Sequence, residues 1–189
     1  MGETCAVATA FYLLSYCKTR PAGYETMMAI DPQNLRKALG CFATGVTVVT
    51  GLGPEGEKLG VTASSFNSVS LDPPLVLFSL NRRAYSMPGF LESGHFAVNV
   101  LREGQEELSN RFATPLADKW DGIHFDIWDF GCPILSDALA NFECQTRYTY
   151  DGGDHVIFVG EIERMRADID GDPLLFYGGR YQALDREQA

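Results

Sequence analysis

The sequence predicts a mainly β chain with short helices, closed as an antiparallel barrel of Greek-key type. Six or seven short segments rich in β-branched and aromatic residues follow one another along the chain. Turns that contain Gly, Pro, Asp or Asn separate these segments at short intervals. The strands do not alternate regularly with helices, which disfavours a parallel doubly wound sheet and favours an antiparallel barrel.

The composition is that of one globular domain. The chain has 189 residues, of which 46% are hydrophobic and 21% charged, so it can bury a core. The net charge of -10 argues against nucleic acid or an anionic membrane surface as the main partner. We expect one domain over residues 29–189, preceded by an N-terminal extension at residues 1–28.

The extension has two interpretations, which the sequence leaves open. Its apolar segment, Cys5–Tyr16, is shorter than the roughly 20 residues that a membrane span needs. Only Glu3 is charged ahead of that segment, so a signal peptide is not expected. The extension either packs on the domain, or the working protein starts near Met27 or Met28. The five cysteines have no CxxC spacing, which is typical of reduced thiols and predicts a cytoplasmic location.

The first elements of the domain are a helix and a hairpin. Asp31 as N-cap and Pro32 at the first position begin the helix, and Gly45 ends it. Its apolar residues recur at helical spacing, so we expect one buried face. That face consists of Leu35, Ala38, Leu39 and Phe42. A strand over Val46–Thr50 then turns at residues 53–56 and returns as a second strand over Lys58–Ser70.

The middle of the chain predicts two strands and two helices. Leu75–Leu80 is expected to be a strand buried on both faces, and His95–Leu101 is the next strand. Between them Tyr85–Leu91 predicts a short helix that Pro88 and Gly89 interrupt. Gln105–Phe112 predicts a further helix.

The last third contains an aromatic loop and a second hairpin. The loop runs from Asp118 to Phe130. Asn141–Tyr150 alternates, turns at residues 151–154 and pairs with His155–Met165. A last short strand over Leu174–Tyr177 leads to a Gly-Gly-Arg-Tyr sequence.

Small hydroxyl residues and a cationic turn flank the Leu75–Leu80 strand. The hydroxyl-rich run before the strand is Thr62, Ala63, Ser64 and Ser65, and the turn after it contains Asn81, Arg82, Arg83 and Ser86. Small side chains let a flat ring approach the backbone, and serine is a mediocre strand former. Hydroxyls and the rigid donor fork of arginine suit a phosphate. The two segments therefore predict a site for a planar ligand with a phosphate.

Six segments in order resemble the flavin reductase family of FMN-binding split β-barrels. The resemblance covers residues 35–184. The matching segments are FATGVTVVT (42–50), GVTASSFNSVSLDPPLVLFSLNRRAYS (60–86), FAVNVL (96–101), LSNRFA (108–113), GDHVIFVGEIE (153–163) and LLFYGGRY (174–181). The resemblance implies the FMN-binding type of split barrel, and it implies that the chain is a short-chain reductase component of a two-component monooxygenase.

The resemblance also implies the roles of site residues. Thr62, Ala63, Ser64 and Ser65 match the run that contacts the flavin. Asn81, Arg82, Arg83 and Ser86 match the turn on the phosphate side, with Arg83 preferred to Arg82 as the clamp. Thr44, Gly45 and Val46 match a segment near the ring. His155, Arg180 and Tyr181 match the nicotinamide side. No catalytic acid or base is assigned, because holding two parallel rings together is sufficient for hydride transfer.

The implied activity is NAD(P)H-dependent reduction of FMN or FAD, with reduced flavin diffusing to a partner monooxygenase. The choices of FMN against FAD and of NADH against NADPH stay open, as does whether flavin is cofactor or substrate. Two alternatives are a flavin-binding protein without reductase turnover, for storage or electron transfer, and a split-barrel oxidase of a pyridoxine-type substrate. Barrels of this family are homodimers with the site near the interface. The aromatic loop supplies either interface area or the domain's own core.

Other chemistries lack their motifs. His95, His124 and His155 are scattered without metal-ligand spacing, so no metal site is expected. The chain has no P-loop, GxGxxG or nucleophile elbow.

Overall fold

The computed structural model describes residues 30–115 and 118–185. The predicted extension at residues 1–28 lies outside these residues, and the domain boundary at residue 29 stays a prediction. All the strands below lie within the unit Lys37–Ala189. Within the described ranges, no helix is both long and apolar enough to cross a bilayer.

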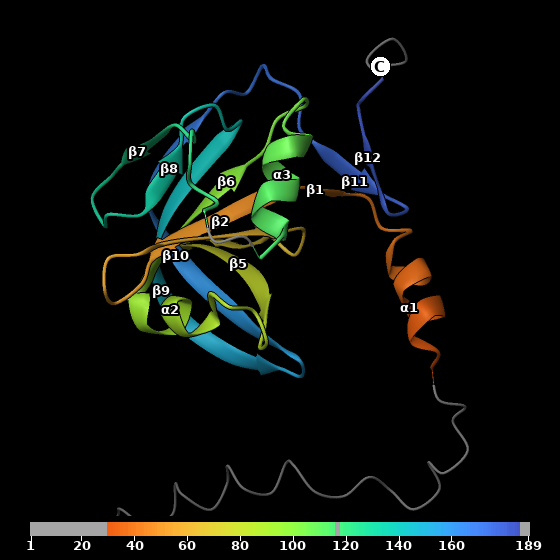
Figure 1. Ribbon diagram of the computed structural model, residues 1–189, viewed down its shortest axis with the longest axis horizontal. Helices are drawn as coiled ribbons and strands as arrows, with labels where there is room; N and C mark the ends of the chain where they lie inside the picture. The colour runs from red at the N-terminus through yellow and green to blue at the C-terminus, as the bar shows by residue number, and fades with distance from the viewer. Residues whose placement is uncertain (1–29, 116–117, 186–189) are drawn as a thin grey trace, which may run out of the picture. The chain divides into compact units, whose positions relative to one another are not determined.

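The described chain is mainly β with three short helices, as predicted (Figure 1). The helices are α1 (Pro32–Leu39), α2 (Met87–Ser93) and α3 (Glu106–Ala113). The strands of the main sheet are β2 (Thr47–Leu52), β3 (Lys58–Ala63), β4 (Asn67–Leu71), β5 (Pro74–Asn81), β6 (His95–Val100), β9 (Ala140–Gly152) and β10 (His155–Ala167). The remaining strands are β1 (Thr44–Gly45), β7 (Phe125–Ile127), β8 (Pro133–Leu135), β11 (Leu175–Tyr177) and β12 (Arg180–Gln182).

The main sheet has the order β3-β2-β6-β9-β10-β5-β4, and each neighbouring pair is antiparallel. Its two edge strands, β3 and β4, are consecutive in the chain. The single strand predicted over Lys58–Ser70 is therefore wrong, because the chain leaves the sheet at Ser64 and re-enters it at the opposite edge. Short polar side chains and a bend occupy this crossing, and the crossing closes the sheet into a barrel.

Ser65 fastens the crossing to β5. Its hydroxyl donates a hydrogen bond to the carbonyl oxygen of Ser79 (3.1 Å) and accepts one from the Ser79 N–H (2.9 Å). One side chain thus replaces a backbone ladder pair at the point where β3 approaches β5. We call this junction, formed by the end of β3, residues Ser64–Phe66 and the end of β5, the seam.

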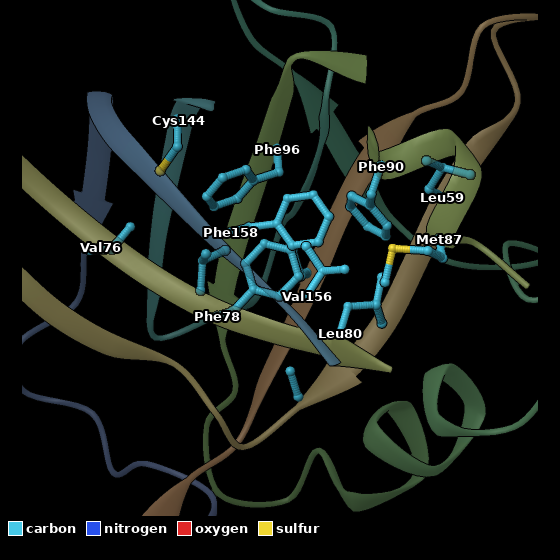
Figure 2. Close-up of a cluster of buried hydrophobic side chains, with 13 residues drawn as sticks. Leu59, Val76, Phe78, Leu80, Met87, Phe90, Phe96, Cys144, Val156 and Phe158 are labelled. Carbon is cyan, nitrogen blue, oxygen red and sulfur yellow. The ribbon is translucent and has the colours of Figure 1, made fainter. Parts of the chain in front are cut away.

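Phenylalanine side chains fill the main core of the barrel. Figure 2 shows Phe78 of β5 and Phe158 of β10 face to face, and their ring centroids lie 4.9 Å apart. The two residues are direct cross-strand partners. Phe96 and Phe90 meet the Phe78 ring edge-on at 5.0 and 5.9 Å. Aromatic rings prefer such stacked and edge-to-face pairs, so this cluster joins β5, β6, β10 and α2.

The alternation along β5 corrects one prediction. The strand was expected to be buried on both faces, but only Val76, Phe78 and Leu80 are buried. Leu77 and Ser79 face the other way and stay partly exposed. The outer side of β5 is therefore free to take part in a site.

A second buried cluster lies under α3. Phe112 of α3 packs with Leu101, Leu174 and the partly buried Trp120. The Trp120 ring meets Phe112 and Phe125 edge-on at 5.0 and 5.4 Å. The aromatic loop thus packs in this chain's own core rather than forming a free surface. It also contains β7, which pairs with β8 and was not predicted from the sequence.

Helix α1 begins as predicted, but it ends at Leu39 rather than at Gly45, which lies in β1, and it does not bury a face. The side chain of Asp31 caps it by accepting a hydrogen bond from the Asn34 N–H at 2.9 Å. Leu35, Leu39 and Phe42 are 43%, 65% and 77% exposed, so the expected buried face is wrong for the single chain.

Replacing Gly160 with alanine is expected to destabilise the barrel. Gly160 lies at a bulge of β10, and an added Cβ would overlap the Phe96 ring and lie 2.9 Å from Cys144 Cβ. Overpacking of this kind costs about 1–3 kcal/mol of unfolding free energy, which urea denaturation measures. Gly45→Ala is the matched control, because nothing lies within 4 Å of its added Cβ. Equal losses for both variants would contradict the packing seen around Gly160.

Candidate functional site

A cavity of about 550 Å³ opens at the seam. Its walls come from the end of β3, the crossing, the end of β5 and the tip of the β9–β10 hairpin. The lining residues are Val61, Thr62, Ala63, Ser64, Ser65, Ser79, Leu80, Asn81, Ala84, Gly152, His155 and Ile157. The volume lies within the range of about 300–1,000 Å³ that small-molecule sites occupy. We call this the seam cavity.

The structure brings the whole predicted hydroxyl run into the seam cavity, with different tasks for its hydroxyls. The Thr62 hydroxyl donates to the carbonyl oxygen of Ser109 in α3 at 2.6 Å, which ties β3 to α3. The Ser65 hydroxyl is already hydrogen-bonded to the backbone of Ser79. Within the described residues the Ser64 side chain makes no hydrogen bond and is exposed. Ser64 is therefore the hydroxyl most available to a ligand.

The two arginines in the turn after β5 have different contacts in the structure. Arg82 Nε donates to the Gly153 carbonyl at 2.8 Å, and its Nη2 pairs with Asp151 at 2.6 Å. That hydrogen bond, followed by the one from the Gly153 N–H, holds the pKa of Asp151 below its ordinary value. Arg82 thus braces the end of β5 against the β9–β10 turn and lines neither the seam cavity nor the second cavity described below.

Arg83 projects differently from Arg82. Its N–H donates to Asn81 Oδ1 at 2.8 Å, which shapes the turn. Its side chain is exposed and makes no ion pair among the described residues. It lines a second cavity together with Ser86, whose hydroxyl does not cap α2. Arg83 and Ser86 are therefore free to bind an anion.

His155 lines the seam cavity from the start of β10, where it is the cross-strand partner of Asn81 at the end of β5. Its Nδ1 lies 2.8 Å from Asp154 Oδ1, and the hydrogen bond and charge of His155 lower the pKa of Asp154. An ionised Asp154 accepts a hydrogen bond from the Nδ1–H group, which leaves Nε2 outside this contact. The side chain is 41% exposed, so Nε2 can reach a ligand in the cavity.

The second cavity, of about 800 Å³, adjoins the seam cavity, because Val61 and Ala84 line both. We call it the lysine cavity. Its other lining residues are Glu57, Lys58, Leu59, Gly60, Arg83, Tyr85, Ser86, Phe112, Ala113, Pro115, Lys119 and Trp120. Burial lowers the pKa of Lys119, whose ammonium donates to the carbonyl oxygens of Phe112 (3.1 Å) and Gly60 (3.4 Å).

Besides Arg82, five predicted site residues lie outside both cavities. Thr44 and Gly45 form β1, and Val46 is buried. Arg180 and Tyr181 lie on β12, where the Tyr181 hydroxyl is 2.9 Å from Ser109 Oγ. Since Ser109 also accepts the Thr62 hydrogen bond through its carbonyl, Tyr181 connects to the seam cavity only through α3. Direct ligand contacts by these five residues stay predictions.

Several lining residues were not predicted. Ser79 and Ile157 face the cavity because β5 and β10 alternate, a signal that the sequence contained. No sequence pattern identifies Gly152 and Ala84 as site residues, because they contribute only by having no large side chain that would fill the cavity. Lys119 lies within the loop Asp118–Phe130, which the sequence predicts only as core or interface, and no local pattern relates it to Arg83.

The buried thiols lie apart from both cavities. Burial raises the pKa of Cys132 to about 12 and raises that of Cys144 as well, with nearby Glu143 adding to both. Such thiols stay protonated and act as small hydrophobic groups. Among the described residues, no three His, Cys, Asp or Glu side chains gather as a metal site would require.

The seam cavity fits a flavin in its chemistry. Small residues and the glycine backbone of the hairpin tip leave room for a planar ring, and Val61, Leu80 and Ile157 supply apolar contact. Arg83 and Ser86 lie just beyond the shared wall, where a phosphate tail would leave the cavity.

The chain is similar in sequence to known flavin reductases. An FMN reductase (NADH), SmoA, of Agrobacterium fabrum is 47% identical over 157 residues, which cover 83% of this chain and 88% of that protein. The reductase subunit HsaB of a flavin-dependent monooxygenase from Rhodococcus jostii is 38% identical over 160 residues, covering 85% and 82%.

A solved structure is similar over most of its length. It is the NADH:FAD oxidoreductase SgcE6 of Streptomyces globisporus C-1027, in complex with NAD and FAD fragments. The TM-score is 0.78 and the identity 38%, covering 86% of this chain and 100% of that chain. A family model described as flavin reductase like domain matches residues 39–185. The chain belongs to the flavin reductase-like domain family.

Proposed function

We propose that this protein is a flavin reductase that uses NADH to reduce FMN or FAD and supplies reduced flavin to a partner monooxygenase. The seam cavity carries the proposal, because its small-residue lining adjoins the second cavity, which Arg83 and Ser86 line. Similarity to an FMN reductase (NADH) and to a monooxygenase reductase subunit supports the reductant and the partner class.

The chain's own residues bind and orient the reactants. The bound flavin supplies the hydride-accepting chemistry. The Ser64 hydroxyl and the backbone of the crossing hold the ring from one side. His155, fixed by Asp154, stands on the opposite wall and orients the nicotinamide side. The bracing of the hairpin tip by Arg82 keeps this wall in place, which favours catalysis by proximity.

The names of similar proteins bear on the choice between FMN and FAD and between NADH and NADPH. Similar proteins are named for FMN in one case and for FAD in another, and both names specify NADH. NADH is therefore the proposed reductant, and both flavins are proposed substrates. The cytoplasmic location and the domain limits 29–189 remain predictions.

A homodimer is the proposed assembly, with the outer face of the β9–β10–β5 sheet as its surface. Tyr148 and Tyr150 stack at 6.0 Å and are each 54% exposed. Tyr150 pairs in register with Ile157, which lines the seam cavity. Opposite residues of an antiparallel pair share a face, so a second copy on this tyrosine pair would lie at the mouth of the cavity.

Purified protein is expected to oxidise NADH catalytically when FMN or FAD is added, as followed by absorbance in the nicotinamide band. A steady-state matrix of two flavins against NADH and NADPH measures the preference, and NADH is expected to have the higher kcat/KM. A protein that binds flavin tightly and consumes no NADH would overturn the reductase assignment in favour of a storage or electron-transfer role.

Arg83→Ala is expected to weaken flavin binding by about 1–3 kcal/mol, because a charged hydrogen bond to the phosphate is lost. Flavin fluorescence titration measures the affinity. Riboflavin, which has no phosphate, should bind both proteins equally. Arg82→Gln is the comparison within the same turn, and a larger loss there than in Arg83→Ala would reverse the two roles.

The double variant Tyr148→Ser, Tyr150→Ser is expected to convert a dimer to a monomer, because it removes the exposed aromatic pair. Light scattering gives the mass. Leu71→Ser is the matched control, since Leu71 is 94% exposed at the β4–β5 turn. A wild-type mass of one chain would refute the dimer, and an unchanged dimer in the double variant would move its interface elsewhere.

A further inference from the structure

Strand β3 forms part of the wall of the seam cavity, yet the main sheet holds it along one edge only. It stands at the end of the strand order and pairs with β2, where Val61 opposes Val49 and Ala63 opposes Thr47. An edge strand leaves the backbone groups of its other side without a ladder. Contacts with other elements must therefore fix the position of β3 on the side of the seam.

Side chains supply these contacts at both parts of the strand. The Lys119 ammonium donates to the carbonyl oxygen of Gly60 at 3.4 Å, and Gly60 lines the lysine cavity. Two residues later, the Thr62 hydroxyl donates to the carbonyl oxygen of Ser109 in α3 at 2.6 Å, and Thr62 lines the seam cavity. The hydrogen bond between Thr62 and Ser109 is therefore the contact that fixes β3 where it borders the seam cavity.

Ser109 is itself held by a second element through its side chain. It is 1% exposed, and its Oγ lies 2.9 Å from the hydroxyl of Tyr181. The same hydroxyl lies 2.8 Å from Asn110 Oδ1. A phenol hydroxyl both donates and accepts, so it can satisfy both contacts. Burial makes Ser109 depend on this partner, because a buried hydroxyl without a hydrogen bond costs free energy.

Tyr181 belongs to the small sheet β1-β11-β12, which Figure 1 shows beside α3. Its cross-strand partner is Phe176, and the two rings meet edge-on with their centroids 5.5 Å apart. Phe176 pairs in turn with Thr44 of β1. An unbroken series of contacts thus runs from the small sheet through Tyr181 and Ser109 to Thr62 at the seam cavity.

We propose that Ser109 is a positioning residue for the flavin, which couples the β11–β12 hairpin to Thr62 on the wall of the seam cavity. Ser109 lines neither cavity, so it acts through Thr62 and not by touching the ligand. The position of Thr62 sets the space that the end of β3 leaves for the ring. The proposal rests on the proposed function, which supplies the flavin as ligand.

Fluorescence titration of the full-length protein with riboflavin and with FMN, in the absence of nicotinamide, tests the coupling. Ser109→Ala removes the hydroxyl and keeps the carbonyl that Thr62 uses. Both flavins should bind about three- to tenfold more weakly, on the scale of one hydrogen bond. The two losses should be equal, because the ring that meets β3 is common to both flavins. Arg83→Ala should instead weaken only FMN.

Tyr181→Phe interrupts the same coupling from the other side and keeps the ring that packs on Phe176. It should weaken riboflavin and FMN as Ser109→Ala does, and it serves as the test if Ser109→Ala does not fold. The double variant should bind no more weakly than either single variant, because both changes remove one shared contact. A direct contact of Tyr181 with the nicotinamide would instead raise the KM of NADH alone.

Thr114→Val is the matched control on the same helix. It removes an exposed hydroxyl that donates to the Asn110 carbonyl at 2.9 Å, at the end of α3, and Thr114 lines neither cavity. Riboflavin affinity should therefore stay within about twofold of the wild type. A purely structural role of Ser109 would lower the melting temperature and the fraction of protein that binds, and it would leave the riboflavin Kd unchanged.

An unchanged riboflavin Kd in Ser109→Ala or in Tyr181→Phe would overturn the proposal. So would losses that add in the double variant, or an equal loss in Thr114→Val. Failure of the proposed function is seen separately, because it appears as wild-type protein that binds flavin without oxidising NADH.

Discussion

Closure of the sheet at the seam is the constraint on which the site depends. The edge strands β3 and β4 are joined by three residues, yet they lie at opposite ends of the strand order. Such a short connection is possible only if the sheet curls until its edges meet. Ser65 holds the meeting point through two hydrogen bonds to Ser79. Where the edges meet without a full backbone ladder, the seam cavity opens.

The elements around the seam are rigid for separate reasons. β5 and β10 are pinned by the stack of Phe78 on Phe158 inside the barrel. Thr62 is tied to α3, and the hairpin tip that carries His155 is braced by Arg82. Hydrogen bonds and an ion pair outside the core therefore position the walls of the seam cavity, while the aromatic core sets the distance between strands. A site built on strand ends in this way is preformed before any ligand binds.

Charge is distributed unevenly over an acidic protein. Arg82 forms an ion pair with Asp151, whereas Arg83, one residue later, makes no ion pair among the described residues. Its neighbours across the lysine cavity are Lys58 and Lys119, from different segments of the chain. A small positive region within a net charge of -10 favours small anionic ligands at this place.

The sequence by itself determined the fold class and the two segments that supply half of the residues lining the seam cavity. These predictions rest on local patterns, namely alternating strands, turn residues and the neighbouring hydroxyl and arginine segments. Local patterns can be recognised in a single sequence. Only the tertiary structure decided that Lys58–Ser70 is two strands, that Arg82 braces while Arg83 is free, and that Lys119 joins Arg83. Each of these depends on contacts between residues far apart in the chain, such as Arg82 with Gly153 and Ser65 with Ser79. Barrel closure creates those contacts, and no spacing along the sequence encodes them.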